Sequence, residues 1–247
     1  MKQTRGFTLI EMAIVLVIIT ILIGGLAMPL SAQIQARRIA ETKKTLEEAR
    51  EAVLGYAMTH PATATATNRH LPCPDTTGDG KENRGLTADP DACMANSGWF
   101  PWVTLGTAPQ DAWGNRLRYA VNTGDLSAPS MPSFAHRSTG FSVSTGLAGA
   151  LQICTTHTCT TPDVASNVVF VLVSHGPNGW GARNVNGNTL ASPTSSHELE
   201  NQDGDNLYVS RAPTQPDNAS GEFDDLVVWV SHAHLIARVC PTGCLPP

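Results

Sequence analysis

The chain has 247 residues, of which 41% are hydrophobic and 15% are charged. This length accommodates one or two domains. The composition excludes a coiled-coil rod, a disordered acidic chain and a collagen-like fibre, because each of these needs a strong bias in residue usage. The net charge of −5 and the pI near 5.9 argue against a general nucleic-acid binder, which needs a basic face.

Charge, proline and cysteine are unevenly distributed along the chain. Residues 1–6 are basic, residues 7–60 carry no net charge, and residues 61–247 are acidic. The last segment also holds all six cysteines and all but one of the 17 prolines. The sequence therefore divides into a short basic start (1–6), a helical stalk (7–60) and a globular body (61–247).

The stalk begins with a long apolar segment. From Phe7 to Leu30 the only charged residue is Glu11. As a helix this segment would span roughly 36 Å at about 1.5 Å per residue, which matches the thickness of a bilayer. Because Lys2 and Arg5 precede it, we expect a single pass with the N-terminus in the cytoplasm and the body exported.

Three kinds of N-terminal segment contain an apolar stretch of this type. A secretory signal peptide has a shorter apolar core that ends at a cleavage site of small residues. A plain signal anchor explains the length and leaves Glu11 unexplained, because a carboxylate in an apolar segment is costly and usually marks a function. The third kind explains both the length and the carboxylate.

The run Arg-Gly-Phe-Thr-Leu-Ile-Glu at residues 5–11, followed by an apolar helix, resembles the class III leader of type IV pilins and type II secretion pseudopilins. The resemblance implies that prepilin peptidase cuts between Gly6 and Phe7 and that Phe7 is then N-methylated. It also implies that Glu11 pairs with the terminal amine of a neighbouring subunit when a filament assembles. Pro29 lies one residue later than the proline that kinks the helix in this family.

The second half of the stalk is amphipathic. Charged residues alternate there with an apolar stripe at helical spacing, which consists of Ile34, Leu46, Ala49, Ala52, Val53 and Tyr56. The dipeptide His60-Pro61 is expected to end the helix. We therefore expect one helix over 7–60 whose apolar stripe packs on the body.

Apolar and alternating runs in the body predict β-strands. The strongest candidates are Val168–Ser174, Leu226–Ser231 and Arg116–Val121, and the weaker ones are Phe141–Val143 and Leu151–Ile153. A short helix is expected at His232–Val239, capped by Ser231. The predicted fold class is α+β and type IV pilin-like: a long N-terminal helix, membrane-spanning and then amphipathic, packed on a small, mostly antiparallel sheet.

Three short segments of the body resemble major pseudopilins and follow in the same order. They are Asp-Ala-Trp-Gly-Asn at 111–115, Ser-His-Gly-Pro-Asn-Gly at 174–179 and Phe-Asp-Asp-Leu at 223–226. The body also has insertions around 61–98 and 182–221, and the chain is longer than a typical major pseudopilin. These departures favour a minor subunit over the major one.

The resemblance also implies a calcium site in the loop over 174–226. Calcium takes six to eight oxygen ligands, chiefly carboxylates and carbonyls. Asp224 and Asp225 match the family's ligands, Asn178 stands where the family has an aspartate, and Asp203 and Asp205 in the insertion are candidates to replace the lost charge. The alternative is that these are solvated acidic loops.

A second segment, Asp-Thr-Thr-Gly-Asp-Gly at 75–80, imitates the start of an EF-hand loop. The position of the last EF-hand ligand holds Leu86 instead of a glutamate. This segment is therefore the weaker calcium candidate.

Six cysteines in an exported body predict three disulfides, for which the sequence allows fifteen connectivities. Nearness along the chain favours Cys73–Cys93, Cys154–Cys159 and Cys240–Cys244. A zinc site at Cys154-x-x-His157-x-Cys159 is the alternative for the second pair, but the sequence offers no convincing fourth ligand.

No catalytic motif stands out, so we expect no enzymatic activity. Trp99, Trp102 and Trp113 are interpreted as core residues, with an adhesive patch as the alternative. The expected function is a structural, minor subunit of a pilin-like filament in a type II secretion or pilus machine; the alternative is a filament-tip or membrane-tethered ligand-binding protein.

The expected partners follow from this function. They are other pilin or pseudopilin subunits, prepilin peptidase, the inner-membrane assembly platform, membrane lipid and a secreted substrate, whereas nucleic acid is not expected. The expected location is the inner membrane with a periplasmic body, followed by a periplasmic or surface filament. Calcium is the only cofactor that the sequence suggests.

Overall fold

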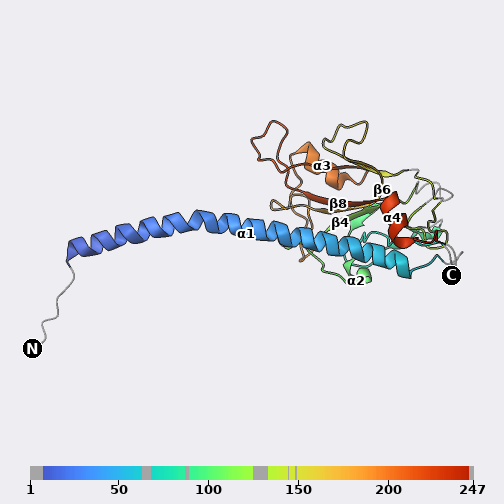
Figure 1. The fold of residues 1–247 in the computed structure, drawn as a ribbon, viewed down its shortest axis with the longest axis horizontal. Coiled ribbons are helices and arrows are strands. Elements are labelled where there is room, and N and C mark those ends of the chain that lie inside the picture. The colour runs from blue at the N-terminus through green and yellow to red at the C-terminus, as the bar shows by residue number, and fades with distance from the viewer. Residues whose placement is uncertain are drawn as a thin grey trace, which may run out of the picture. The chain divides into compact units, whose positions relative to one another are not determined.

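The computed structural model describes residues 8–62, 68–86, 89–124, 133–143, 145–147 and 149–244, with the backbone alone for 25–29. The chain divides into two compact units, Met1–Ala40 and Glu41–Pro247. Figure 1 shows the order of the elements, whose bounds are α1 Leu9–Thr59, β1 Arg84–Leu86, β2 Asp89–Cys93, β3 Ser97–Trp99, α2 Trp102–Leu105, β4 Arg118–Val121, β5 Leu151–Cys154, β6 Ala165–Ser174, α3 Ser196–Asp203, β7 Leu207–Val209, β8 Leu226–Ser231 and α4 His232–Val239.

The first unit consists of the N-terminal part of α1. Its large apolar side chains are exposed on every side of the helix, from 43% for Ile19 to 89% for Leu9. A helix that is apolar all round is stable only where other apolar groups cover it. Among the described residues of this unit, no other side chains bury these apolar groups.

Within the described parts of the chain, we find no helix whose length and apolar character together suffice to cross a bilayer. The membrane span that the sequence predicts for residues 7–30 is therefore not confirmed.

The second unit is built on a mixed sheet of six strands with β6 at its centre. β6 pairs antiparallel with β4, β5 and β8, β3 extends the sheet beyond β4, and β7 joins β5 in parallel. β1 and β2 form a separate antiparallel pair. The sheet is mostly antiparallel, as expected, and the α+β fold class is confirmed.

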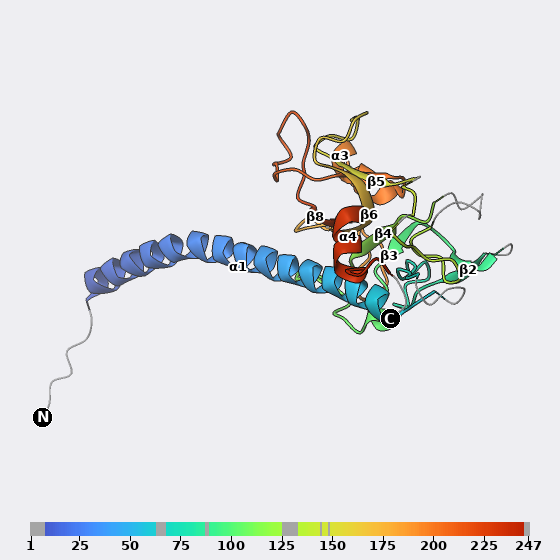
Figure 2. The same cartoon turned by 45° about the vertical axis from the view of Figure 1, so that its right-hand side comes forward.

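Side chains alternate between the two faces of this sheet because successive residues of a strand point in opposite directions. Tyr119, Phe170 and Leu172 belong to the larger buried cluster, whereas Ala120 and Val171 belong to a second one. Figures 1 and 2 show the C-terminal part of α1 and the helix α4 beside β4. The larger cluster therefore fills the space between the sheet and these helices.

The C-terminal part of α1 contributes a helical stripe to this core. Leu46, Ala49, Val53, Leu54 and Ala57 are all at most 2% exposed and belong to the larger cluster. Their spacing of three or four residues places them on one face of the helix. The sequence predicts this face correctly for residues 46–56, but not for Ile34, which is 46% exposed.

Other predicted elements differ in detail from the structure. α4 starts and ends at the predicted residues, and the Ser231 hydroxyl accepts a hydrogen bond from the amide of His234, as an N-cap does. Phe141–Val143 is not a strand: Phe141 forms only an isolated bridge with Arg69. β1, β2, β3 and β7 are short and carry no apolar alternation, so the sequence does not reveal them.

Leu46→Ala should lower the free energy of unfolding of the second unit by about 2–5 kcal/mol, because it leaves a cavity in a fully buried site. Ile34→Ala is the matched control, since Ile34 is 46% exposed on the same helix and should change stability by less than about 0.5 kcal/mol. Urea unfolding of the full chain in detergent measures both. Equal effects of the two variants would contradict the assigned core.

Candidate functional site

The first candidate site lies at the start of α1. Thr8 precedes the helix and Glu11 occupies its first turn. The Thr8 amide and hydroxyl both donate to Glu11 Oε2 at 2.8 Å, and the Glu11 amide donates to Thr8 Oγ1 at 3.4 Å. This reciprocal arrangement is a capping box, which satisfies two amides that the helix itself leaves without acceptors.

The capping box gives Glu11 a partner within its own chain. Sequence reasoning missed this contact, although Thr-x-x-Glu before an apolar run is its known signal. Gly6 and Phe7, the predicted cleavage and methylation residues, lie outside the described residues. Their predicted roles therefore stay predictions.

The second candidate site is a cluster of three carboxylates in the second unit. Glu198 comes from α3, whereas Asp224 and Asp225 directly precede β8, and one oxygen of each lies within 4.8 Å of the others. Both the side-chain amide of Asn178, at 3.1 Å, and the amide of Asp224, at 3.0 Å, donate to Glu198 Oε1. The amide of Asn178 donates to Asp224 Oδ2 at 3.0 Å.

Two buried side chains position Asp225. His175 Nδ1 lies 3.3 Å from Asp225 Oδ1, and the Asn201 side-chain amide donates to Asp225 Oδ2 at 2.8 Å. Asn201 Oδ1 in turn accepts from the amide of Val209 at 2.7 Å. The carboxylate is therefore held between the end of β6, α3 and β7.

The turn after β6 approaches this cluster closely. Gly176 has φ 57°, and a Cβ on it would lie 2.4 Å from Asp224 Oδ1. A side chain at position 176 would therefore meet the carboxylate, and the positive φ also favours glycine. This turn is the part of the Ser-His-Gly-Pro-Asn-Gly segment that shapes the cluster.

The cluster holds more negative charge than its hydrogen bonds neutralise. Burial raises the pKa of Glu198 to about 7, with a further contribution from the charge of Asp225. Burial likewise raises the pKa of Asp224 to about 7, and Glu198 and Asp225 add to this effect. Asp224 Oδ1 is buried and has no hydrogen-bond partner among the described residues. A cation or a proton at this place would lower the free energy of the cluster.

The structure brings only part of the predicted calcium set together. The cluster includes three predicted residues, which are Asn178, Asp224 and Asp225. The sequence does not predict Glu198 as a ligand, because Glu198 lies in an insertion that the resemblance to pseudopilins does not cover. Asp203 and Asp205 lie instead in a separate group with Glu200.

The EF-hand-like segment uses its first aspartate for a different purpose. Asp75 is buried, and its carboxylate accepts from the amides of Thr77, Gly78 and Gly80 at 2.6–2.9 Å. These bonds occupy the oxygens that a calcium ion would need. The carboxylate therefore organises a turn.

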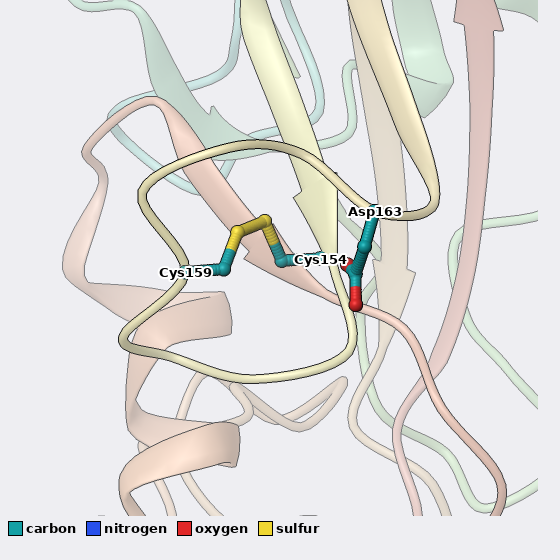
Figure 3. Close-up of side chains that lie close together, drawn as sticks. All are labelled: Cys154, Cys159 and Asp163. Atoms are coloured by element: carbon teal, nitrogen blue, oxygen red, sulfur yellow. A yellow bond between two sulfur atoms is a disulfide. The ribbon is translucent and has the colours of Figure 1, made fainter.

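The cysteines form the three expected disulfides, Cys73–Cys93, Cys154–Cys159 and Cys240–Cys244. Figure 3 shows the bond that closes the loop after β5, with Asp163 near Cys154. Asp163 accepts from the amide of Thr155 at 2.8 Å. The predicted alternative, a zinc site that uses both Cys154 and Cys159, does not agree with this bond, since zinc needs the two thiolates.

The tryptophans predicted as core residues are partly buried. The guanidinium of Arg116 lies 4.6 Å from the centre of the Trp102 ring, and that of Arg118 lies 5.7 Å from the Trp99 ring. Trp102 packs against the larger core cluster. The core interpretation is therefore supported for Trp102, whereas Trp99 and Trp113 belong to neither buried cluster.

Comparison with known proteins identifies the N-terminal motif. Residues 1–27 match the family model of the prokaryotic N-terminal methylation motif. The chain thus carries the class III leader that type IV pilin-like and pseudopilin-like proteins share. No curated protein and no solved structure matches the chain.

Glu198→Gln should stabilise the metal-free protein at pH 8. A carboxyl group whose pKa is raised to about 7 on folding loses stability as the pH rises from about 4.5 through 7, because the folded state holds the proton more tightly. Glutamine keeps the acceptor oxygen and removes this loss, so we expect a gain on the order of 1–2 kcal/mol, allowing for solvent screening.

Urea unfolding with EDTA at pH 5 and pH 8 measures this effect. The wild type should lose stability between the two pH values, and the variant should lose less. Glu48→Gln, at an exposed glutamate of α1, is the control and should keep the wild-type pH dependence. A variant with the wild-type pH dependence would show that Glu198 is not in this environment.

Proposed function

We propose that the chain is a structural subunit, of minor abundance, in a type IV pilin-like filament of a type II secretion or pilus machine. The observation that carries this proposal is the methylation motif at residues 1–27, joined to a helix whose apolar side chains are exposed. Such a surface gains most when copies of the same kind of helix pack against each other. The role is structural and not catalytic.

The partners follow from the steps of assembly. Prepilin peptidase removes residues 1–6, the exposed apolar surface of α1 contacts lipid of the inner membrane, and the assembly platform then transfers the subunit into the filament. The three disulfides support a periplasmic body, since disulfides persist in oxidising compartments. A secreted substrate is the further partner of a secretion pseudopilin.

Filament copy number separates this role from the alternative, a filament-tip or membrane-tethered ligand-binding protein. Quantitative mass spectrometry of sheared filaments should find several copies of the chain per filament. A single copy at the tip, or its absence from filaments, would favour the alternative.

Gly6→Asp should leave the chain uncut, because the peptidase site accepts only a small residue there. The matched variant Gly6→Ala should still be cut. Intact-mass analysis in a host with prepilin peptidase distinguishes a chain that begins at Phe7 from one that begins at Met1. Wild-type chain that stays uncut would contradict the assignment of the motif.

Glu11→Gln should be cut normally and yet enter filaments several-fold less often than the wild type. Glutamine can still accept the hydrogen bonds from Thr8, but it lacks the negative charge that attracts the terminal amine of a neighbour. Thr8→Val is the matched control, since it removes the hydroxyl cap and keeps the charge. Crosslinked filament fractions measure incorporation.

If Thr8→Val entered filaments poorly while Glu11→Gln entered as well as the wild type, the cap, and not the charge, would be the feature that matters. Wild-type incorporation of Glu11→Gln would overturn the proposed pairing.

We further propose that the carboxylate cluster holds a calcium ion. The donor set suits a hard cation, and the unpartnered Asp224 Oδ1 and the raised pKa values of Glu198 and Asp224 both support it. Glu198, Asp224 and Asp225 would hold the ion, which would neutralise their charge and tie α3 to the segment before β8.

Calcium should raise the melting temperature of the full chain by several degrees at saturation, since a ligand at 100 times its Kd adds about 2.7 kcal/mol. Asp224→Asn should abolish this shift, and Asp203→Asn, in the separate group, should retain it. A shift that survives Asp224→Asn and disappears in Asp203→Asn would place the ion in the other group.

A further inference from the structure

Two histidines meet beside the disulfide loop that follows β5. His157 belongs to the loop closed by Cys154 and Cys159, and His197 is the second residue of α3. Their ring centres lie 4.9 Å apart, and the rings are nearly perpendicular at 88°. Neither histidine takes part in the sites described above.

The hydrogen bonds of His197 define its tautomer. Its Nδ1 lies 3.0 Å from the carbonyl oxygen of Ser220, and a carbonyl oxygen only accepts, so Nδ1 carries the proton. Nε2 therefore presents a lone pair. The His197 side chain is among the buried ones at 7% exposure, and Nε2 is shielded from solvent with no partner among the described residues.

His157 has a second ring nitrogen that is buried without a partner among the described residues. Its Nδ1 is also shielded from solvent and has no partner in the part of the chain that the structure describes. Burying a polar nitrogen without a partner is costly. Because the two nitrogens belong to adjoining rings, one bound group between the rings would give both of them a partner.

The separation of the rings suits a shared metal ion. With nitrogen–metal distances of about 2.0–2.1 Å, two imidazoles at a near-tetrahedral angle place their ring centres about 5 Å apart. The carbonyl of Ser220 behind His197 is the outer-shell acceptor that metal-bound histidines usually have. Neutral imidazole suits zinc and copper far better than calcium.

Charged side chains lie around the two histidines: Glu198 directly follows His197 on α3, and Arg211 and Asp163 lie on the neighbouring segments. Arg211 donates to the carbonyl of Gly221 at 3.1 Å and lies close enough to His197 to disfavour its protonated form. Asp163, on the loop of His157, provides a negative charge beside the disulfide (Figure 3).

We propose that His157 and His197 bind one divalent transition-metal ion of the zinc–copper class, with water in the remaining coordination positions. The disulfide Cys154–Cys159 closes the loop that presents His157, so the site depends on the oxidised state of this pair. The ion joins the β5 loop to α3. This proposal does not rest on the function proposed above.

Isothermal titration of the full, oxidised chain in detergent with Zn²⁺ tests the proposal, with excess Ca²⁺ present to occupy carboxylates. The wild type should bind one ion, and His157→Ala and His197→Ala should each weaken binding at least tenfold. His234→Ala is the matched control, because His234 is an exposed histidine on α4, and it should bind as the wild type does.

A second measurement distinguishes histidines that coordinate a metal ion from histidines whose rings only pack against each other. Cu²⁺ bound to the wild type should show two coordinated nitrogens by electron paramagnetic resonance, and His157→Ala should show one. His157 lies on a loop that the disulfide closes, so this variant should keep the wild-type melting temperature without metal. The double variant Cys154→Ser/Cys159→Ser should bind Zn²⁺ more weakly.

Wild-type affinity in His157→Ala would overturn the proposal. The proposal would also be overturned if the wild type bound Zn²⁺ no more tightly than the double variant His157→Ala/His197→Ala. In that case water would be the partner of the two nitrogens. Loss of binding in Glu198→Gln but not in the histidine variants would place the ion in the carboxylate cluster and would also overturn it.

Discussion

The burial of one stripe of α1 against the sheet is the interaction on which the rest of the second unit depends. Leu46, Val53 and Ala57 are fully buried and complete the core that also contains Tyr119 and Phe170. Without these side chains one face of the sheet would lie open to water. The same helix is exposed and apolar at its start, so one continuous element has two surfaces that need different partners.

The position of the carboxylate cluster follows from the register of β6 and β8. Ser174 pairs with Leu226, which places the turn after β6 beside the residues that precede β8. Asn178 and Asp224 therefore meet although they are far apart in the sequence. α3 then adds Glu198 over this end of the sheet. Burial, together with the charge of the neighbouring carboxylates, raises the pKa of Glu198 and of Asp224 there.

The sequence predicts well those features that depend on a long periodic pattern or a specific motif. The stripe of α1, the strands β6 and β8 and the helix α4 all follow from apolar spacing, which burial enforces. Short strands such as β3 and β7 depend on pairing with distant residues, and no local pattern marks them. Phe141 is apolar and buried for packing reasons alone, which is why a strand prediction there is wrong.

The candidate sites likewise contain residues that the local sequence predicts and residues that only the tertiary fold brings together. Asp224, Asp225 and Asn178 were found from a resemblance, because they lie in segments of similar sequence. Glu198 lies on a helix within an insertion, and its approach to Asp224 is a property of the tertiary fold. In the sequence His157 stands out only because it lies between two cysteines. In the structure its ring contacts the ring of His197, and no spacing along the chain predicts this contact.

The central strand of the sheet also constrains the order in which the chain folds. β6 pairs with β8 over Val168–Ser174, and α3 and β7 lie between the two strands in the sequence. Long-range pairings of this kind form slowly, because the intervening chain must first be ordered. During synthesis this edge of the central strand therefore stays open until β8 emerges, and a chain that stops before Leu226 leaves the edge without its partner strand.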